Sequence, residues 1–374
     1  MKETQFVVTV FLSACWAGIA EAGKNSDKFG NKLIRAGFYI TGFLGLWYCY
    51  AIATTGIDYT AYLREYQMLA DVPNDRILSS GFEIGYLLIA KLLAFAGANA
   101  EMALLIFRTI AILNVAVSLW ILQRDIDLFF AVFAYVCILF FDGYHIVMMM
   151  VASFILLGVS IALRGKMKAG IVLCVIAATI HYSGLLFFVV FLAIYIGNEK
   201  NIQLPRWSFL WITAAIVTLC AGWIVPLIIG KVGLLAKYRK YVAVTTQYFG
   251  IAQVFYYCFP AVSMMQLLKK KENDVYQRFF YSLIPIGFCV AGMGYSFAVL
   301  DRMFVFFAAN FVIFIPHYIE CLNRRQADGV IFNVQFSTGI WKMVFLIYFI
   351  LRAKIFISGH PVVYDFGPLL GLFA

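Results

Sequence analysis

Charged residues are scarce in this chain: they make up only 13% of its 374 residues, and acidic residues number only 19. The apolar runs also lack the strict alternation with polar residues that strands of a transmembrane barrel show. The sequence is instead 64% apolar, with a mean hydropathy of +0.89. A soluble fold of this length cannot bury so much apolar surface, whereas a bilayer favours it. The composition therefore predicts an all-α, polytopic integral membrane protein.

Several familiar chemical motifs are missing as well. There is no Walker loop, no GxGxxG fingerprint, no HExxH pair and no nucleophile elbow. None of the eight cysteines forms a CxxC or another metal-ligand spacing, and we expect them to be small apolar core residues. The sequence therefore gives no sign of a cofactor or a metal, and it shows no motif that would bind a nucleotide-activated donor.

The net charge of +10 does not indicate a nucleic-acid partner. Most Lys and Arg residues lie in short clusters between apolar runs, which is how membrane topology is encoded. By this rule the cytoplasmic clusters are Lys24 to Arg35, Arg164-Lys166-Lys168, Lys269-Lys270-Lys271 and Arg324-Arg325.

The sequence has thirteen apolar runs. If all thirteen runs crossed the membrane, these basic clusters would lie on opposite sides of it, so one run must fail to cross. Segment 82–98 is the candidate for not crossing, because it is short and carries Glu83 and Lys91. With Leu87 these residues form a polar stripe at i, i+4 and i+8, so we expect a re-entrant or interfacial helix. About twelve transmembrane helices remain, with both termini outside, in a single membrane domain over 1–374. The runs are 5–21, 34–55, 82–98, 101–122, 127–143, 145–163, 168–181, 183–197, 208–230, 250–268, 277–300, 303–320 and 337–357.

This topology exposes two external loops, 56–100 and 231–249, which we expect to contribute to a site. The second is basic, against the orientation rule, and is suited either to an anionic external ligand or to lipid headgroups. Its candidate substrate-binding residues are Lys237, Tyr238, Arg239, Lys240 and Tyr241.

The first external loop combines aromatic and acidic residues. If it is helical, Tyr59, Tyr62 and Tyr66 share one face, suited to stacking on sugar rings or, equally, to a membrane-interface belt. Asp58 and Glu83 are the external carboxylates nearest the membrane surface. Either is a candidate to accept a proton from an attacking hydroxyl, and either can instead cap a helix or form an ion pair.

His181-Tyr182-Ser183 joins two short apolar segments at their outer ends. A histidine flanked by apolar residues is often structural, but this position also suits a base or a donor to phosphate.

Two arginines have properties that suit phosphate binding. Arg302 follows Asp301 at the outer junction of two runs, and arginine binds phosphate bidentately; a local Asp–Arg pair is the alternative. Arg108 lies well inside its run, where an arginine is a functional candidate unless it snorkels outward.

With these residues in place, the chain resembles the EpsG/Wzy-type polysaccharide polymerases. Gly56-Ile57-Asp58-Tyr59 with Tyr62 matches the family's first external motif, and Phe82-Glu83-Ile84-Gly85-Tyr86-Leu87-Leu88 matches its Glu-containing helix. His181-Tyr182-Ser183 matches a central motif, and Asp301-Arg302-Met303-Phe304 approximates a late one.

The chain departs from the family at two positions. Met148-Met149-Met150 stands where members often carry an Arg-Gln pair, so Arg108 or Arg239 is a candidate replacement. Asp301 stands where serine is common, which leaves its role open.

The resemblance implies a GT-C-like fold and a glycosyltransferase acting in the bacterial cytoplasmic membrane, with its site on the external face. It implies undecaprenyl-diphosphate-linked glycans as donor and acceptor, membrane lipids as surroundings, and a chain-length regulator as a further partner. The implied catalytic residues are His181, Arg302, Asp58 and Glu83. The implied substrate-binding residues are Tyr59, Tyr62, Tyr86, Arg108, Tyr182, Ser183, Asp301 and the loop residues 237–241.

Other membrane functions remain open at this point. A flippase for lipid-linked units would place ionisable groups near the midplane in repeated halves, and no repeat is visible here. A ligase that attaches finished polymer would use similar residues. A membrane acyltransferase would need a histidine and acid pair within the membrane, which the sequence does not show.

Overall fold

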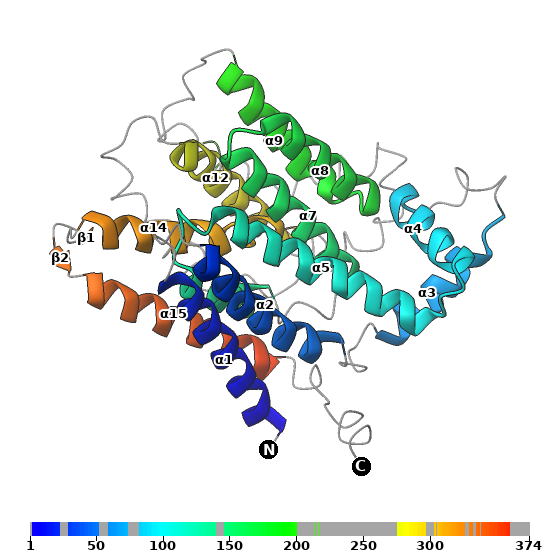
Figure 1. The fold of residues 1–374 in the computed structure, drawn as a ribbon. Coiled ribbons are helices and arrows are strands. Elements are labelled where there is room, and N and C mark those ends of the chain that lie inside the picture. Colours follow the sequence, from blue (N-terminus) through cyan, green and yellow to red (C-terminus); the bar gives the residue numbers. More distant parts are fainter. Residues whose placement is uncertain are drawn as a thin grey trace.

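The computed structural model describes most of the helical segments of the chain (Figure 1). The described residues are 2–22, 29–51, 59–73, 82–139, 146–199, 275–296, 305–325, 329–331, 334–336 and 338–359, with isolated residues 213, 216 and 303.

Nearly all of these residues are helical. In hydrocarbon the backbone must satisfy its own N–H and C=O groups, and a helix does so within one segment. Most helices coincide with the apolar runs to within a few residues. The helices are α1 Lys2–Ala22, α2 Phe29–Ala51, α3 Tyr59–Asp71, α4 Ile84–Phe95, α5 Ala100–Leu122, α6 Leu128–Ile138, α7 Ile146–Leu163, α8 Met167–Ile180, α9 Gly184–Glu199, α12 Val275–Ser296, α14 Phe311–Arg325 and α15 Thr338–Gly359.

Three helices in the described part are long and apolar enough to cross a membrane: Ala100–Leu122, Ile146–Leu163 and Val305–Arg324. Several shorter apolar helices accompany them, among them α4, α6 and α8. The chain is therefore an integral membrane protein. α4 has only 12 residues, which is about 18 Å at 1.5 Å per residue and too short to span a bilayer core of about 30 Å.

One element departs from the expected all-helical fold. Between α14 and α15 the chain forms an antiparallel hairpin of β1 Gly329–Ile331 and β2 Val334–Phe336, with Ile331 paired to Val334. The segment follows the basic pair Arg324-Arg325, so by charge it lies outside the hydrocarbon, where irregular backbone and open strand edges are tolerated. Its β-branched residues favour extended backbone.

Small residues set the helix spacing. A Cβ on Gly170 of α8 would lie 2.5 Å from the carbonyl oxygen of Gly158 in α7, so only glycine permits this approach. Such small-residue contacts are how helices associate where lipid gives no hydrophobic driving force. α5 lies on the other side of α7, where Asn114 Nδ2 donates to Ser153 Oγ at 3.1 Å.

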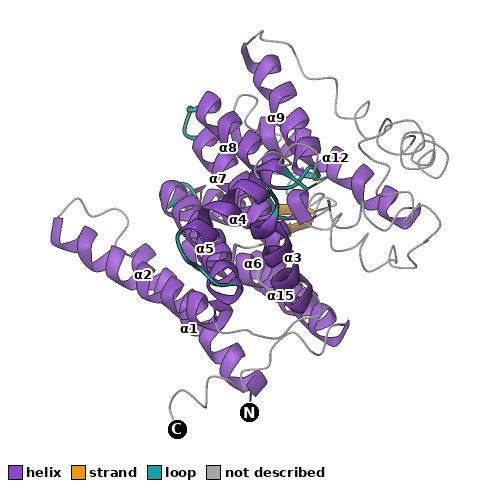
Figure 2. Cartoon of the chain, turned by 90° about the vertical axis from the view of Figure 1, so that its right-hand side faces the viewer, coloured by secondary structure: helices purple, strands orange, loops and turns teal. Residues whose placement is uncertain are grey.

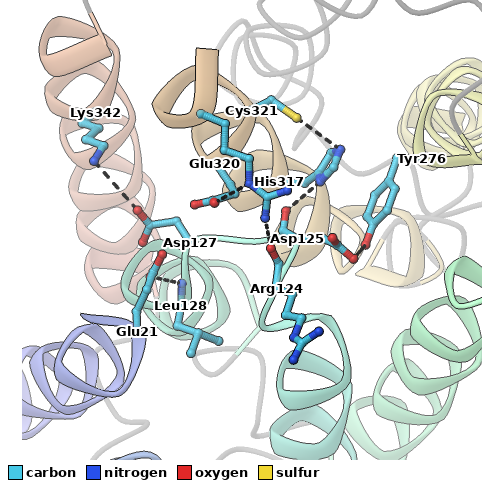
Figure 3. Close-up of polar contacts among 11 residues, drawn as sticks. Glu21, Arg124, Asp125, Asp127, Leu128, Tyr276, His317, Glu320, Cys321 and Lys342 are labelled. Atoms are coloured by element: carbon cyan, nitrogen blue, oxygen red, sulfur yellow. Dashed lines mark hydrogen bonds and ion pairs between the residues drawn. The ribbon is translucent and has the colours of Figure 1, made fainter. Parts of the chain in front are cut away.

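The loop after α5, residues 123–127, anchors one end of the bundle, and we call this loop and its partners the polar hub (Figure 3). Asp125 Oδ2 lies 2.8 Å from Arg164 Nη1 and accepts a 3.2 Å hydrogen bond from the Tyr276 hydroxyl. His317 Nδ1 donates to the Asp125 carbonyl at 2.8 Å, and the two rings of His317 and Tyr276 stack at 3.8 Å. One loop residue thus joins α7, α12 and α14.

Asp127 continues the polar hub toward the first and last helices. Its Oδ1 caps α6 by accepting from Phe130 N at 3.1 Å, and its Oδ2 lies 3.9 Å from Lys342 Nζ on α15. Glu21 of α1 accepts from Leu128 N at 2.6 Å. Segments that are far apart in sequence therefore meet at this loop.

Candidate active site

α3 and α4 lie at the end of the bundle opposite the hairpin, and Figure 2 looks onto that end. α5 connects this end to the polar hub: Ala100 begins beside α3 and α4, and Leu122 directly precedes the hub loop. Its 23 residues span about 34 Å, close to the thickness of a bilayer core. The two polar regions are therefore separated by about one membrane.

α4 meets the C-terminal end of α8 in a contact that only glycine allows. A Cβ on Gly85 would lie 2.5 Å from Thr179 Oγ1 and 2.9 Å from Ile180 N. Glu83 is two residues before this glycine, and His181 directly follows Ile180. The contact thus joins two motifs that are almost a hundred residues apart, and we call the residues around it the α4–α8 cluster.

The polar stripe expected on α4 faces the protein in the structure. Leu87 is fully buried, Glu83 is 7% exposed and Lys91 is only half-buried, so this stripe turns toward the protein. A helix bordered by hydrocarbon gains by placing apolar side chains outward and polar ones inward. The exposed face is apolar: Ile84, Leu88, Leu92 and Phe95.

Glu83 occupies the N-cap position of α4 without capping it through its side chain. The helix-capping alternative for this carboxylate is therefore wrong. Its burial places a carboxylate at the start of the helix that contacts α8.

Arg108 is 4% exposed and does not snorkel outward. Its guanidinium carbon lies 5.3 Å from the centre of the Tyr59 ring, a cation–π contact between α5 and the first residue of α3. A desolvated guanidinium held on an aromatic face is a site for an anionic group.

The predicted aromatic face of the first external loop is present. α3 is helical, Tyr66 is buried, and Tyr59 and Tyr62 are half-buried on the same side. The Tyr66 hydroxyl donates to the Ala98 carbonyl at 2.9 Å, which fixes α3 against the start of α5. Burial raises the pKa of the Tyr59 phenol, and Arg108 partly opposes that shift. The phenol therefore stays protonated at neutral pH and can donate a hydrogen bond.

Tyr86 lies beneath this face. It is 1% exposed and its ring packs at 5.6 Å from that of Phe107. Tyr62, Glu65 and Glu83 are near enough to act on it electrostatically. Its hydroxyl has no hydrogen-bond partner among the residues that the structure describes.

His181 follows the last residue of α8 and has an extended backbone. Its Nδ1 is a hydrogen-bond acceptor. The backbone N–H of Ser183 donates to Nδ1 at 3.1 Å, and the Ser183 hydroxyl lies 2.6 Å from the same atom. Because a backbone N–H can only donate, Nδ1 carries no proton and the neutral ring carries it on Nε2. Nε2 is therefore a donor.

Ser183 also contacts the methionine segment that departs from the family pattern. Its hydroxyl lies 3.7 Å from the sulfur of Met148, the first residue of that segment. The position where an arginine was expected thus borders the His181 motif, and the nearby intramembrane arginine on the adjacent helix α5 is Arg108.

Eight predicted site residues lie on or directly beside the helices that meet at this end of the bundle: Tyr59, Tyr62, Glu83, Tyr86, Arg108, His181, Tyr182 and Ser183. The others lie outside the described residues: Asp58, Lys237, Tyr238, Arg239, Lys240, Tyr241, Asp301 and Arg302. In the described part, no group of three or more His, Cys, Asp or Glu is placed to hold a metal ion.

Sequence reasoning missed Thr179, and it named Gly85 and Met148 only within longer motifs without assigning either a role in the site. A glycine within the first turn of an apolar helix is a signal for close backbone approach, but the sequence does not say which helix approaches. The whole polar hub was also missed. Its signal was a run of polar residues, Gln123-Arg124-Asp125, between two apolar helices.

Comparison with known proteins identifies the family to which the chain belongs. The model of the EpsG family matches residues 37–361, which is most of the chain. No curated protein and no solved structure matches. The matched range spans the positions from Gly56 to Arg302. The chain belongs to the EpsG family, a Wzy-type polysaccharide polymerase family.

Proposed function

We propose that this protein is a polysaccharide polymerase that joins undecaprenyl-diphosphate-linked repeat units on the outer face of the bacterial cytoplasmic membrane. The observation that carries the proposal is the contact of Gly85 with Thr179 and Ile180, which joins Glu83 and the His181 motif in a membrane protein of this family. Arg108 and Tyr59 complete a cluster with acidic, cationic and aromatic groups.

The proposed topology has about twelve crossings in a GT-C-like single domain, with α4 at the outer interface. The separation of the α4–α8 cluster from the polar hub along α5 supports it. The polar hub includes Arg164 and Arg324, which belong to basic clusters assigned to the cytoplasm. The opposite end, with α3 and α4, then faces outward, and the proposed topology assigns loop 231–249 to the same side of the membrane.

In the proposed reaction a sugar hydroxyl of one lipid-linked repeat unit attacks the anomeric carbon of the glycan on another. A carbon–oxygen bond to the acceptor forms as the bond to the diphosphate breaks, with inversion, and the electron pair leaves on the diphosphate. Arg302 with Arg108, Lys237 and Arg239 compensates that charge, because arginine binds phosphate bidentately.

The proton of the attacking hydroxyl needs an acceptor, and Glu83 is the described carboxylate that we assign to this role. His181 is assigned as a donor from Nε2, because Nδ1 is occupied by Ser183. This supports the phosphate-donor alternative for the histidine over the base. Asp58 remains a second candidate base.

The remaining candidates are assigned to substrate binding. The aromatic groups of Tyr59, Tyr62, Tyr86 and Tyr182 suit sugar rings and hydroxyls. The remaining polar ligands are Ser183, Tyr238, Lys240, Tyr241 and Asp301.

The test is the size distribution of surface polysaccharide in cells. His181→Ala and Arg302→Ala should abolish long polymer while single lipid-linked units accumulate. His317→Ala, in the polar hub, is the matched control and should leave polymer length unchanged once expression is equalised.

Unchanged chain length in both site variants would refute the assignments. Long polymer that stays on the carrier lipid in a deletion strain would instead indicate a ligase.

A further inference from the structure

An apolar groove runs along the outside of the bundle between α2 and α5. Its volume is about 230 Å³, and almost nothing polar lines it. Its floor is largely buried: Tyr39 and Phe43 from α2 and Ile112 from α5 are each at most 6% exposed. Ile40, Leu44 and Leu113 form rims that are more than half exposed, so the groove opens toward lipid.

The groove has defined ends. At one end the Trp47 indole N–H donates to Thr109 Oγ1 at 2.8 Å, and at the other the Tyr39 hydroxyl donates to the Ala116 carbonyl at 2.7 Å. Trp47 is eight positions after Tyr39, which is about 12 Å along α2. The groove therefore runs parallel to the helices, as a lipid tail does.

Its Trp47 end lies one residue along α5 from Arg108. Thr109 directly follows Arg108, whose guanidinium rests on the ring of Tyr59. α2 ends at Ala51, about 6 Å beyond Trp47 at 1.5 Å per residue. The cationic end of the groove is thus near the membrane surface, and its apolar length extends toward the bilayer centre.

We propose that this groove binds the isoprenoid chain of a polyprenyl-diphosphate-linked saccharide, with the phosphate end at Arg108. The inference rests on the proposed function and names where one of its two substrates lies. A buried cation at the shallow end and an apolar channel below it complement an anionic head on an apolar tail. The groove is too small for a whole polyprenyl chain, so it holds the isoprene units nearest the phosphate, and the rest of the chain lies in the bilayer.

Ala116→Phe tests the groove by filling its deep end. The apparent KM for a long-chain polyprenyl-diphosphate donor should rise about tenfold, the effect of losing roughly two buried methylene groups. The KM for a short-chain donor that does not reach Ala116 should not change. Val117→Phe is the matched control: it adds the same ring one residue away on α5, at a site 47% exposed and outside the groove, and should leave both KM values unchanged.

The outcomes separate the two proposals. If the unmodified protein polymerises no donor of any chain length, the proposed function fails. If it polymerises both donors and Ala116→Phe raises neither KM, or raises both equally, the groove proposal fails.

A photocrosslinker at Leu113 gives a second measurement that does not depend on Ala116→Phe folding. With the crosslinker at position 113, a radiolabelled polyprenyl-diphosphate saccharide should be captured. With the crosslinker at position 33 on α2 it should not, because Leu33 is about as exposed as Leu113 but lies outside the groove. Excess unlabelled polyprenyl phosphate should compete, and excess phospholipid should not. Equal competition by phospholipid would overturn the proposal and indicate an ordinary membrane lipid.

Discussion

At the polar hub the carboxylates are held by protein groups: Asp125 by Arg164, and Glu320 by Arg324 at 2.8 Å. At the α4–α8 cluster, Glu83 is buried at the start of α4, and the hydroxyl of Tyr86 has no hydrogen-bond partner among the described residues. Both regions place charge at the ends of apolar helices, which is costly unless the charge is compensated or used. The difference indicates that the polar hub uses its carboxylates to join helices, whereas the α4–α8 cluster leaves the Tyr86 hydroxyl available to a ligand.

The way in which the helices meet also differs. Side chains from α7, α12 and α14 converge on Asp125, so the polar hub is built from long polar side chains (Figure 3). At the α4–α8 cluster the backbones themselves touch at Gly85. A backbone contact fixes position within a few tenths of an ångström, which is what a reacting geometry requires.

The largest expected effect comes from Glu83→Gln. The substitution keeps the size of the side chain but removes the proton acceptor, so polymerisation should fall by about 10²- to 10⁴-fold. Glu101→Gln, at an exposed site in the first turn of α5, is the control and should leave the rate unchanged. Polymerisation can be followed as incorporation of labelled repeat units in vesicles. A Glu83→Gln rate within twofold of the unmodified protein would end the assignment of this carboxylate as the base.

Gly85→Ala tests whether the backbone contact positions the site. The added Cβ meets backbone atoms of α8, which cannot move as a flexible side chain can, so α4 must shift. We expect about a 100-fold loss of polymerisation, since a displacement near 1 Å is enough for that.

Gly37→Ala is the matched helical control, because no atom lies within 4 Å of its added Cβ. It should retain activity and gain slightly in thermal stability. Equal activity of the two variants would show that the contact of α4 with α8 does not set the site.

Asp125→Asn should have the smallest effect, and it should change the stability of the protein and not its polymerisation rate. It removes the charge that Arg164 faces but retains the shape, and both side chains are partly exposed, so we expect a loss of about 1 kcal/mol in stability. Thermal unfolding in detergent measures the loss. Polymerisation per folded molecule should stay the same; a fall of more than tenfold would mean that the polar hub also shapes the outer site.

The helical fold was largely predictable from sequence, because apolar runs in a membrane must become helices. α5, α7 and α8 each begin and end within about one residue of the predicted runs. Two local features were not predictable. The hairpin of β1 and β2 lies in a short segment whose pattern gave no clear period. The rotation of α4 depended on which neighbour it met, and the stripe of Glu83, which suited a membrane interface, faces the protein.

The sequence by itself determined that the chain is a membrane protein, and through its ordered motifs it indicated the family. Hydropathy and residue identity carry that information because each acts locally. Only the tertiary structure decided that Gly85 contacts α8, that Arg108 rests on Tyr59, and that loop 123–127 gathers helices from the whole chain. These are contacts between residues far apart in sequence, and they depend on how side chains of particular size fit together, which no local pattern encodes.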